Sequence, residues 1–294
     1  MFELWYDQRP KYELRPETAQ RRHRGAIAMF PSHPMSRRPC SQIGHKPLGH
    51  GEAFACRVLE FIDCQPDSRD AFGYLQQVTK GEFYLVGGLL RRLLFGSHTH
   101  CDIDIIVPNA DDRAFQALDE LKVPTDASSS AFRRYKWNNL QLDIFQPRQY
   151  GMTDIDSALR HFDLRINAIA FHVGSGLIVD PFGVLRGGRS DPGINWPSWS
   201  SQSTKRAIIH AIRLDRIMKE IPQLTISQID AARLLSRIAP EVESCEWSEV
   251  SHHTSCSKSA FLEQFISLLD CRIHYNPPAR SINPARSSTI HAAQ

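Results

Sequence analysis

Three aspartates are the strongest candidates for chemistry in this chain. Asp102 and Asp104 form an Asp-Ile-Asp triplet at the start of an apolar run that ends at Val107. If this run is a β-strand, residues two apart project from the same face, so the two carboxylates lie side by side. Asp143 lies in a second run, 140–145, whose alternation predicts another strand. Carboxylates are the ligands that hard divalent cations prefer, and three could hold two ions about 3.5–4 Å apart.

The sequence around Asp102 and Asp104 adds a second feature. A chain with this aspartate content contains about one Asp-x-Asp triplet by chance, and Asp154-Ile155-Asp156 is a further instance that serves as a control. Only the first triplet follows a Gly87-Gly88 pair that joins an apolar run to a helical pattern. Glycines at such a turn let backbone N–H groups approach a phosphate, and the helix N-terminus favours negative charge.

The elements that position these residues predict a mixed α/β domain. Beyond about Ser200 the pattern turns helical, and the loop 183–203 that precedes it is rich in Gly, Pro, Ser and Trp. Periodicity and β-propensity predict strands at 83–86, 103–107, 140–145, 168–173 and 177–179, and helices at 52–63, 72–78, 89–94 and 111–121.

Composition sets the remaining limits. The 294 residues are 41% hydrophobic and 23% charged, which is typical of a globular protein. The net charge of +3 is too small to indicate nucleic-acid binding by itself. Residues 1–50 and 271–294 are basic, whereas the intervening residues are acidic. We predict a disordered arm (1–50), a head domain (51–200), a helical neck (201–271) and a disordered tail (272–294).

The chain shows no pattern for a membrane or a secreted scaffold. No apolar run approaches the ~20 residues of a membrane span, and the N-terminal residues do not form a secretory signal. The seven cysteines have neither Cys-x-x-Cys pairs nor the tight, even spacing of a disulfide framework. We therefore expect a cytoplasmic protein whose cysteines are free thiols.

Five motifs in order resemble one family. The segment 85–96, followed by Asp102-Ile103-Asp104, resembles the head of the bacterial-type (class II) tRNA CCA-adding enzymes and poly(A) polymerases. Later segments are similar to the family's Arg-Arg-Asp-Phe-Thr-Ile-Asn-Ala motif, its Asp-Pro-Phe-Gly turn and two neck helices, at 163–170, 180–183, 210–214 and 229–242. The resemblance spans roughly residues 70–245.

The resemblance implies a fold and an activity. The fold would be a DNA polymerase β-like nucleotidyltransferase head with a mixed sheet, followed by a short α-helical neck. The activity would be in-line attack of an RNA 3′-hydroxyl on the α-phosphate of a nucleoside triphosphate, which releases pyrophosphate. The partners implied are the nucleoside triphosphate and an RNA such as a tRNA, without a stable protein partner.

The resemblance also assigns roles to single residues. Two Mg²⁺ ions would be held by Asp102 and Asp104, with Asp143 as the third acid. The nucleotide would contact residues of the glycine turn and of the later motifs, namely Gly87, Gly88, Arg91, Asp163 and Asn167, while Arg165 and Arg206 could substitute for basic residues that the family places nearby.

Several motif positions depart from the family. The residue after Arg91 is Arg92 where the family has an acid, and the paired arginines of the later motif fall on His161 and Phe162. The family's Glu-Asp-x-x-Arg motif, which reads the incoming base, falls on Ser203, Thr204 and Ala207, with Arg206 one residue away. The helical body beyond the neck is also short.

These departures leave two alternatives open. The acceptor could be a protein or a small-molecule hydroxyl, because the base-reading motif is missing. The chain could instead be a degenerate paralogue that binds RNA or a nucleotide without catalysis. Retention of all three carboxylates argues against decay, because clustered acids without a cation repel one another.

Overall fold

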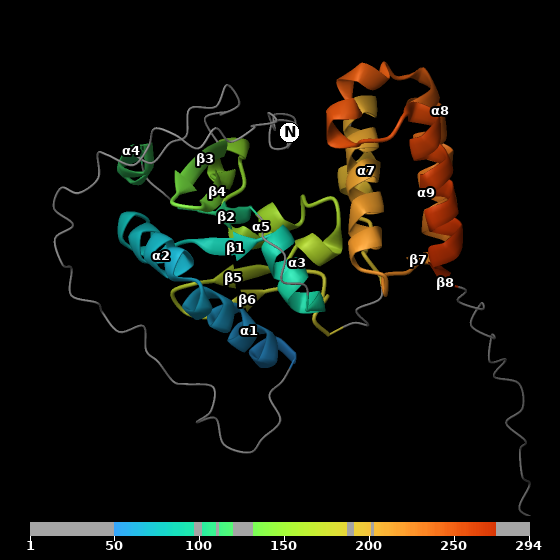
Figure 1. Ribbon diagram of the computed structural model, residues 1–294. Helices are drawn as coiled ribbons and strands as arrows, with labels where there is room; N and C mark the ends of the chain where they lie inside the picture. Colours follow the sequence, from blue (N-terminus) through green and yellow to red (C-terminus); the bar gives the residue numbers. More distant parts are fainter. Residues whose placement is uncertain are drawn as a thin grey trace, which may run out of the picture.

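A computed structural model describes residues 50–96, 102–109, 112–119, 132–186, 191–200 and 203–274. It contains a six-stranded sheet with flanking helices and, beside it, a three-helix bundle (Figure 1). The expected arms, 1–50 and 272–294, lie almost entirely outside the described residues. The mixed α/β architecture predicted from the sequence is confirmed.

The described helices are α1 His50–Cys64, α2 Pro66–Val78, α3 Gly88–Phe95, α4 Asp112–Asp119, α5 Ile155–Leu159, α6 Trp196–Ser200, α7 Thr204–Glu220, α8 Gln228–Ser244 and α9 Lys258–Arg272. The described strands are β1 Tyr84–Val86, β2 Ile103–Ile106, β3 Phe132–Trp137, β4 Leu140–Phe145, β5 Ala170–His172, β6 Ile178–Val179, β7 Ile226–Ser227 and β8 Ile273–His274. Strands β7 and β8 form a separate parallel pair.

The large sheet has the order β3-β4-β2-β1-β5-β6. Strands β2 and β4 are parallel, and every other neighbouring pair is antiparallel. Side chains alternate between two apolar layers, as the period of a strand requires. Leu85, Ile105 and Ile144 pack in the cluster that includes α1, α2 and α3, whereas Val86 and Ile106 face a smaller cluster that includes α5.

Helices α7, α8 and α9 enclose a second core (Figure 1). The buried residues of α8 are spaced at intervals of three and four, the pattern of a helix with one buried face, whereas α7 is buried on most of its sides. This core also contains Leu164, Ile194 and Trp199, which precede the bundle in the chain. The hydrophobic core of the bundle therefore begins before the boundary that we expected near Ser200.

Several elements were not expected from the sequence, among them β3, α5, α6 and the two-residue strands β7 and β8. Strand β3 carries Arg133, Arg134 and Lys136 among its aromatic residues, which hides the alternation of a strand. The short helices α5 and α6 each form about one turn, too little for periodicity to reveal.

The cysteine and membrane expectations can be compared with the structure. Cys56 is disulfide-bonded, so the expectation of free thiols is wrong for this residue. The thiols of Cys64, Cys245, Cys256 and Cys271 are free. Within the described segments, no helix combines the length and the apolar character that crossing a bilayer would need.

Candidate active site

The turn between β1 and α3 is built around Gly87. Its φ of +72° lies in the left-handed region that favours glycine. A Cβ atom at Gly87 would lie 2.6 Å from Oδ2 of Asp104, which is closer than real contacts allow. The backbone N–H of Gly88 points to the same Oδ2, with a long N–O distance of 3.5 Å. The turn and the Asp104 carboxylate are thus in direct contact, and only glycine fits between them.

Strand pairing brings Asp143 to the same place. Asp104 is the register partner of Val86 on one side and of Asp143 on the other. Paired residues of neighbouring strands project from the same face, so the two carboxylates are neighbours. Both are buried, with exposures of 6% for Asp104 and 3% for Asp143. Asp102 immediately precedes β2 and is half-buried.

Arg134 completes this group of acids. Its Nε and Nη2 atoms each donate a hydrogen bond of 2.8 Å to one oxygen of Asp143. The hydrogen bonds to Asp143 raise the pKa of Arg134 against the effect of burial, and the charges of Asp143, Asp102 and Asp104 raise it further. All three carboxylates therefore act on one guanidinium. We call Asp102, Asp104, Asp143 and Arg134 the sheet cluster.

Sequence reasoning missed Arg134, although a signal was present. Asn138 and Asn139 form a two-residue turn between β3 and β4, and Asn138 has a φ of +49°. Asparagine is favoured at such positions of tight hairpins. Counting outward from this turn places residue 134 opposite residue 143, which is the observed register.

The donor set of the sheet cluster can be compared with the needs of a divalent cation. Within the ranges that the structure describes, no group of three or more His, Cys, Asp or Glu side chains is arranged to hold a metal. Asp143 does not offer a ligand oxygen, because both of its oxygens accept hydrogen bonds from Arg134. Asp102 and Asp104 remain as a carboxylate pair, and Mg²⁺ is commonly held by one or two carboxylates together with substrate phosphates. The residues thus fit one such ion.

The control triplet has a different role. Asp154 is the N-cap of α5, where its carboxylate accepts a hydrogen bond of 2.7 Å from the backbone N–H of Ser157. Asp156 forms an exposed ion pair with Arg160 on the same helix. These are ordinary roles of a helix start, in agreement with the use of this triplet as a control.

Arg91 and Asn167 contact each other. Nη1 of Arg91 donates a 2.5 Å hydrogen bond to Oδ1 of Asn167, and both residues are buried. Arg92 forms an ion pair of 2.6 Å with Glu220 at the end of α7, and Arg91 lies 3.8 Å from the other oxygen of that carboxylate. The basic residue at position 92 therefore pairs with an acid from the bundle.

A second buried carboxylate lies where the sheet domain meets the bundle. Asp163 accepts hydrogen bonds from the backbone N–H of Leu164 and from Nη1 of Arg213, at 3.0 Å and 3.1 Å. His210 Nδ1 lies 3.6 Å from the same carboxylate. Arg206, His210 and Arg213 follow each other on α7 at helical spacing, and all are wholly or largely buried. We call these four residues the junction cluster.

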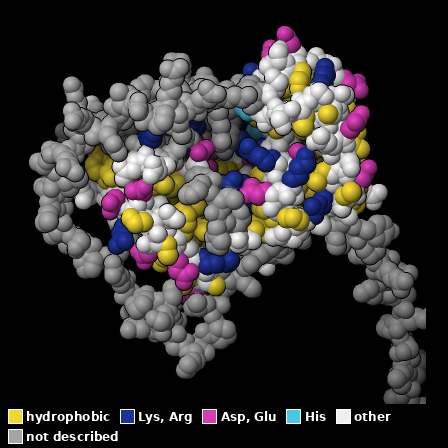
Figure 2. Space-filling model, viewed as in Figure 1, with side chains coloured by type: hydrophobic (Ala, Val, Ile, Leu, Met, Phe, Trp, Pro, Cys, Tyr) yellow, Lys and Arg dark blue, Asp and Glu magenta, His cyan; other side chains and the backbone are white. Residues whose placement is uncertain are grey.

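Burial and charge act in opposite directions on the junction cluster. Burial alone would raise the pKa of Asp163, but Arg213, His210 and Arg206 lower it to about 2. Burial lowers the pKa of His210 to about 3, although Asp163 opposes this shift. His210 is therefore neutral at pH 7, and the two arginines keep Asp163 ionised. In Figure 2, basic and acidic side chains gather where the sheet domain meets the bundle.

Arg165 lies apart from both clusters. Its side chain is exposed, and its guanidinium lies 5.4 Å from the centre of the Phe182 ring, within reach of a cation–π interaction. Phe182 belongs to the predicted Asp-Pro-Phe-Gly turn. There, Asp180 accepts hydrogen bonds of 2.9 Å and 2.8 Å from the backbone N–H groups of Val184 and Leu185.

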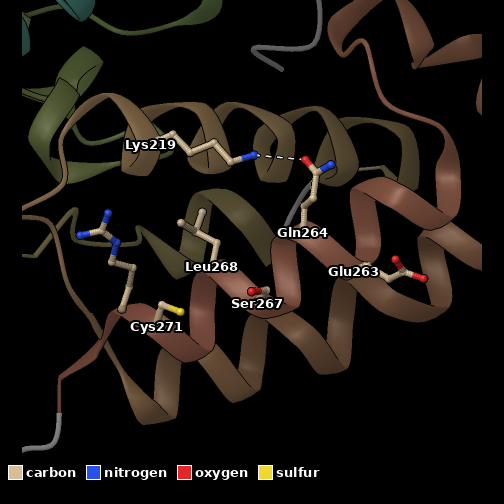
Figure 3. A pocket seen from close by; sticks show the side chains of 7 residues that line it. Lys219, Glu263, Gln264, Ser267, Leu268 and Cys271 are labelled. Atoms are coloured by element: carbon tan, nitrogen blue, oxygen red, sulfur yellow. Dashed lines mark hydrogen bonds between the residues drawn. The ribbon is translucent and has the colours of Figure 1, made fainter.

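A pocket lies between α7 and α9, away from these acids. Figure 3 shows that it is lined by polar side chains such as Lys219, Gln264 and Ser267, and the cavity volume is about 550 Å³. Lys219 donates a 3.4 Å hydrogen bond to Gln264 across the pocket. None of the residues predicted for the site lines this pocket. The geometry of the acids, and not this pocket, defines the candidate site.

The structure thus divides the predicted residues into groups. Gly87, Gly88, Asp104 and Asp143 meet at one end of β2, with Asp102 beside them. Arg91 and Asn167 form a hydrogen-bonded pair. Asp163 and Arg206 belong to the junction cluster, and Arg165 lies apart, against Phe182.

Comparison with known proteins gives a likeness in structure only. No protein-family model matches the sequence, and no curated protein matches it. A solved structure of a tRNA-processing enzyme in an apo form superposes with a TM-score of 0.52 and 17% identity, over 69% of this chain and 57% of that chain. A tRNA nucleotidyltransferase complexed with a primer tRNA and an incoming ATP analogue gives a TM-score of 0.51 and 17% identity, over 67% of this chain and 60% of that chain.

These values establish the fold. The chain shares the fold of these two structures, as the resemblance implied, with a mixed sheet followed by a helical bundle. It spans less than two thirds of the length of the first of these structures. Activity, substrate and cofactor are treated below as proposals.

Proposed function

We propose that this protein is a Mg²⁺-dependent nucleotidyltransferase that transfers a nucleoside monophosphate from a nucleoside triphosphate to an RNA 3′-hydroxyl. One observation carries the proposal: Asp104 lies directly against the Gly87-Gly88 turn, and Asp143 is its neighbour on the adjacent parallel strand. This combination supplies carboxylates for a cation and backbone N–H groups for a phosphate within one site. The shared fold supports the reaction class.

Each residue of the site has a chemical task in this proposal. Asp102 and Asp104 hold the Mg²⁺ ion, which supplies charge neutralisation on the reacting phosphate when bound. Gly88 begins α3, so the positive end of the helix dipole faces the triphosphate. Arg91 of the same helix contacts the triphosphate, and the hydrogen bond to Asn167 orients its guanidinium.

The acceptor is the less constrained part of the proposal. An RNA 3′ end is favoured because one protein with the same fold is described in complex with a primer tRNA. Selection of the base is not assigned to any residue. Arg206, the nearest counterpart of the base-reading arginine, is buried in the junction cluster beside Asp163.

An extension assay tests the reaction. The full chain would be incubated with Mg²⁺, one α-labelled nucleoside triphosphate at a time, and either mixed RNA or tRNA that lacks its 3′ end. We expect labelled RNA and pyrophosphate, and we expect Asp104→Asn to reduce incorporation by about 10³-fold, the size seen when one essential electrostatic group is removed. The matched control is Asp156→Asn, which changes the same atoms in the other Asp-Ile-Asp triplet and should leave activity unchanged.

The outcomes separate the alternatives. Equal extension by wild type and Asp104→Asn would contradict the mechanism. Label that moves to a protein or small molecule instead of RNA would keep the reaction and change the acceptor. Nucleotide binding without pyrophosphate release would favour the degenerate paralogue.

A further inference from the structure

Arg134 and Asp143 form a closed pair within the proposed site. The guanidinium offers two parallel N–H groups, and the carboxylate accepts one on each oxygen, both at 2.8 Å. Such a bidentate pair is the strongest and most directional form of an ion pair. Both side chains are largely buried, with exposures of 12% for Arg134 and 5% for Asp143.

The pair changes what Asp143 can offer to a metal ion. A second divalent cation at Asp143 would need an oxygen that now accepts a hydrogen bond from Arg134. Displacing the guanidinium would leave a buried positive charge beside the incoming cation, which is unfavourable at low dielectric.

We propose that the guanidinium of Arg134 takes the place of a second divalent cation at Asp143, so that the site binds one divalent ion, on Asp102 and Asp104. Arg134 is then a positioning residue: it fixes the Asp143 carboxylate and neutralises it. This inference rests on the proposed function, because it concerns the cation of the same site. It departs from the expectation of two ions that the resemblance implied.

The neighbouring residue provides a matched control. Arg133 lies on the same strand but on the opposite face, where Nη1 pairs with Asp119 at 2.6 Å. Arg133→Gln and Arg134→Gln therefore remove the same charge from adjacent positions of β3. Only the second exposes Asp143 to a metal ion.

The test counts bound Mn²⁺, a paramagnetic substitute for Mg²⁺, by electron paramagnetic resonance of the full chain without nucleotide. We expect one ion per chain in wild type, in Asp143→Asn and in Arg133→Gln. Asp102→Asn should weaken this binding at least tenfold. Arg134→Gln should take up a second ion, and the double variant Arg134→Gln/Asp143→Asn should return to one.

Two results would overturn the inference, and they differ in what else they affect. Two ions in wild type, one of which is lost in Asp143→Asn, would overturn the inference and leave the proposed function intact. No bound ion in wild type would overturn the metal site of the proposed function as well. If circular dichroism shows that Arg134→Gln is unfolded, the wild-type and Asp143→Asn counts still decide between one ion and two.

Discussion

The sheet cluster and the junction cluster surround their buried carboxylates with different numbers of basic side chains. In the sheet cluster, three acids share the guanidinium of Arg134. In the junction cluster, two guanidiniums and an imidazole surround Asp163 alone. In the first cluster several acids act on one guanidinium, and two of them, Asp102 and Asp104, are the residues that we propose to hold a cation. The second cluster supplies its own positive charge, which favours a structural role for Asp163 in addition to the nucleotide contact that the resemblance implied.

The largest effect should come from removing the acid of the junction cluster. Asp163→Asn leaves the buried Arg213 without its carboxylate partner, so we expect the free energy of unfolding to fall by about 3–5 kcal/mol. Urea denaturation followed by circular dichroism measures the loss. Asp156→Asn changes an exposed side chain of α5, serves as the control and should not change stability measurably. If Asp163→Asn changed the free energy of unfolding as little as the control, Asp163 would have no structural role that distinguishes the junction cluster from the sheet cluster.

The pH dependence of stability should report His210. The pKa of His210 is lowered to about 3 in the folded protein, below the ordinary value of about 6.5. Between these values the unfolded chain binds a proton that the folded chain does not, so stability falls as the pH falls through this window. One such group gives at most about 1.4 kcal/mol per pH unit.

The variant His210→Gln isolates this contribution. Comparison of urea denaturation at pH 7, 6, 5 and 4 should give a shallower loss of stability for the variant than for wild type. Parallel curves would show that His210 titrates in the folded state at its ordinary pKa. Asp163, whose pKa is about 2, contributes only at lower pH, between its ordinary pKa of about 3.8 and 2.

A smaller effect is expected at the contact between α3 and the bundle. Glu220→Gln weakens the ion pairs of Glu220 with Arg92 and Arg91. The side chains of Arg92 and Glu220 are partly exposed to solvent. We expect a loss of about 1 kcal/mol, at the upper end for exposed pairs. A double-mutant cycle with Arg92→Gln measures the coupling. Arg92 stands where the family has an acid. A coupling energy of zero would mean that Arg92 forms no stabilising ion pair with Glu220 of the bundle.

Much of the fold was predictable because its signals are local. The alternation in 140–145 and the apolar run after Asp102 predicted β4 and β2, and the glycine pair predicted the turn into α3. Strand β3 was not predicted, because its charged residues interrupt the apolar alternation. Those charges are explained by the structure: Arg133 pairs with an acid on one face of the sheet and Arg134 with Asp143 on the other.

The site was predictable only in part, for a similar reason. Asp104 and Asp143 are neighbours because their strands pair, and the alternating pattern of each strand can be seen in the sequence. The junction cluster joins Asp163 to Arg213, fifty positions later, through packing of α7 against the segment 191–199. Such long-range packing leaves no periodic signal, so a sequence pattern indicated a nucleotide contact for Asp163 but not its ion pair with Arg213.

The short segment from Asp163 to Asn167 belongs to two structures at once. At its start, Asp163 is bound to α7, and Leu164 lies in the core of the bundle. At its end, Asn167 accepts the hydrogen bond of Arg91, one helical turn from Gly88. Five residues span the two contacts, so a tilt of the bundle would be transmitted through Asn167 and Arg91 to the N-terminal end of α3. The position of the glycine turn is thereby coupled to the position of the three-helix bundle.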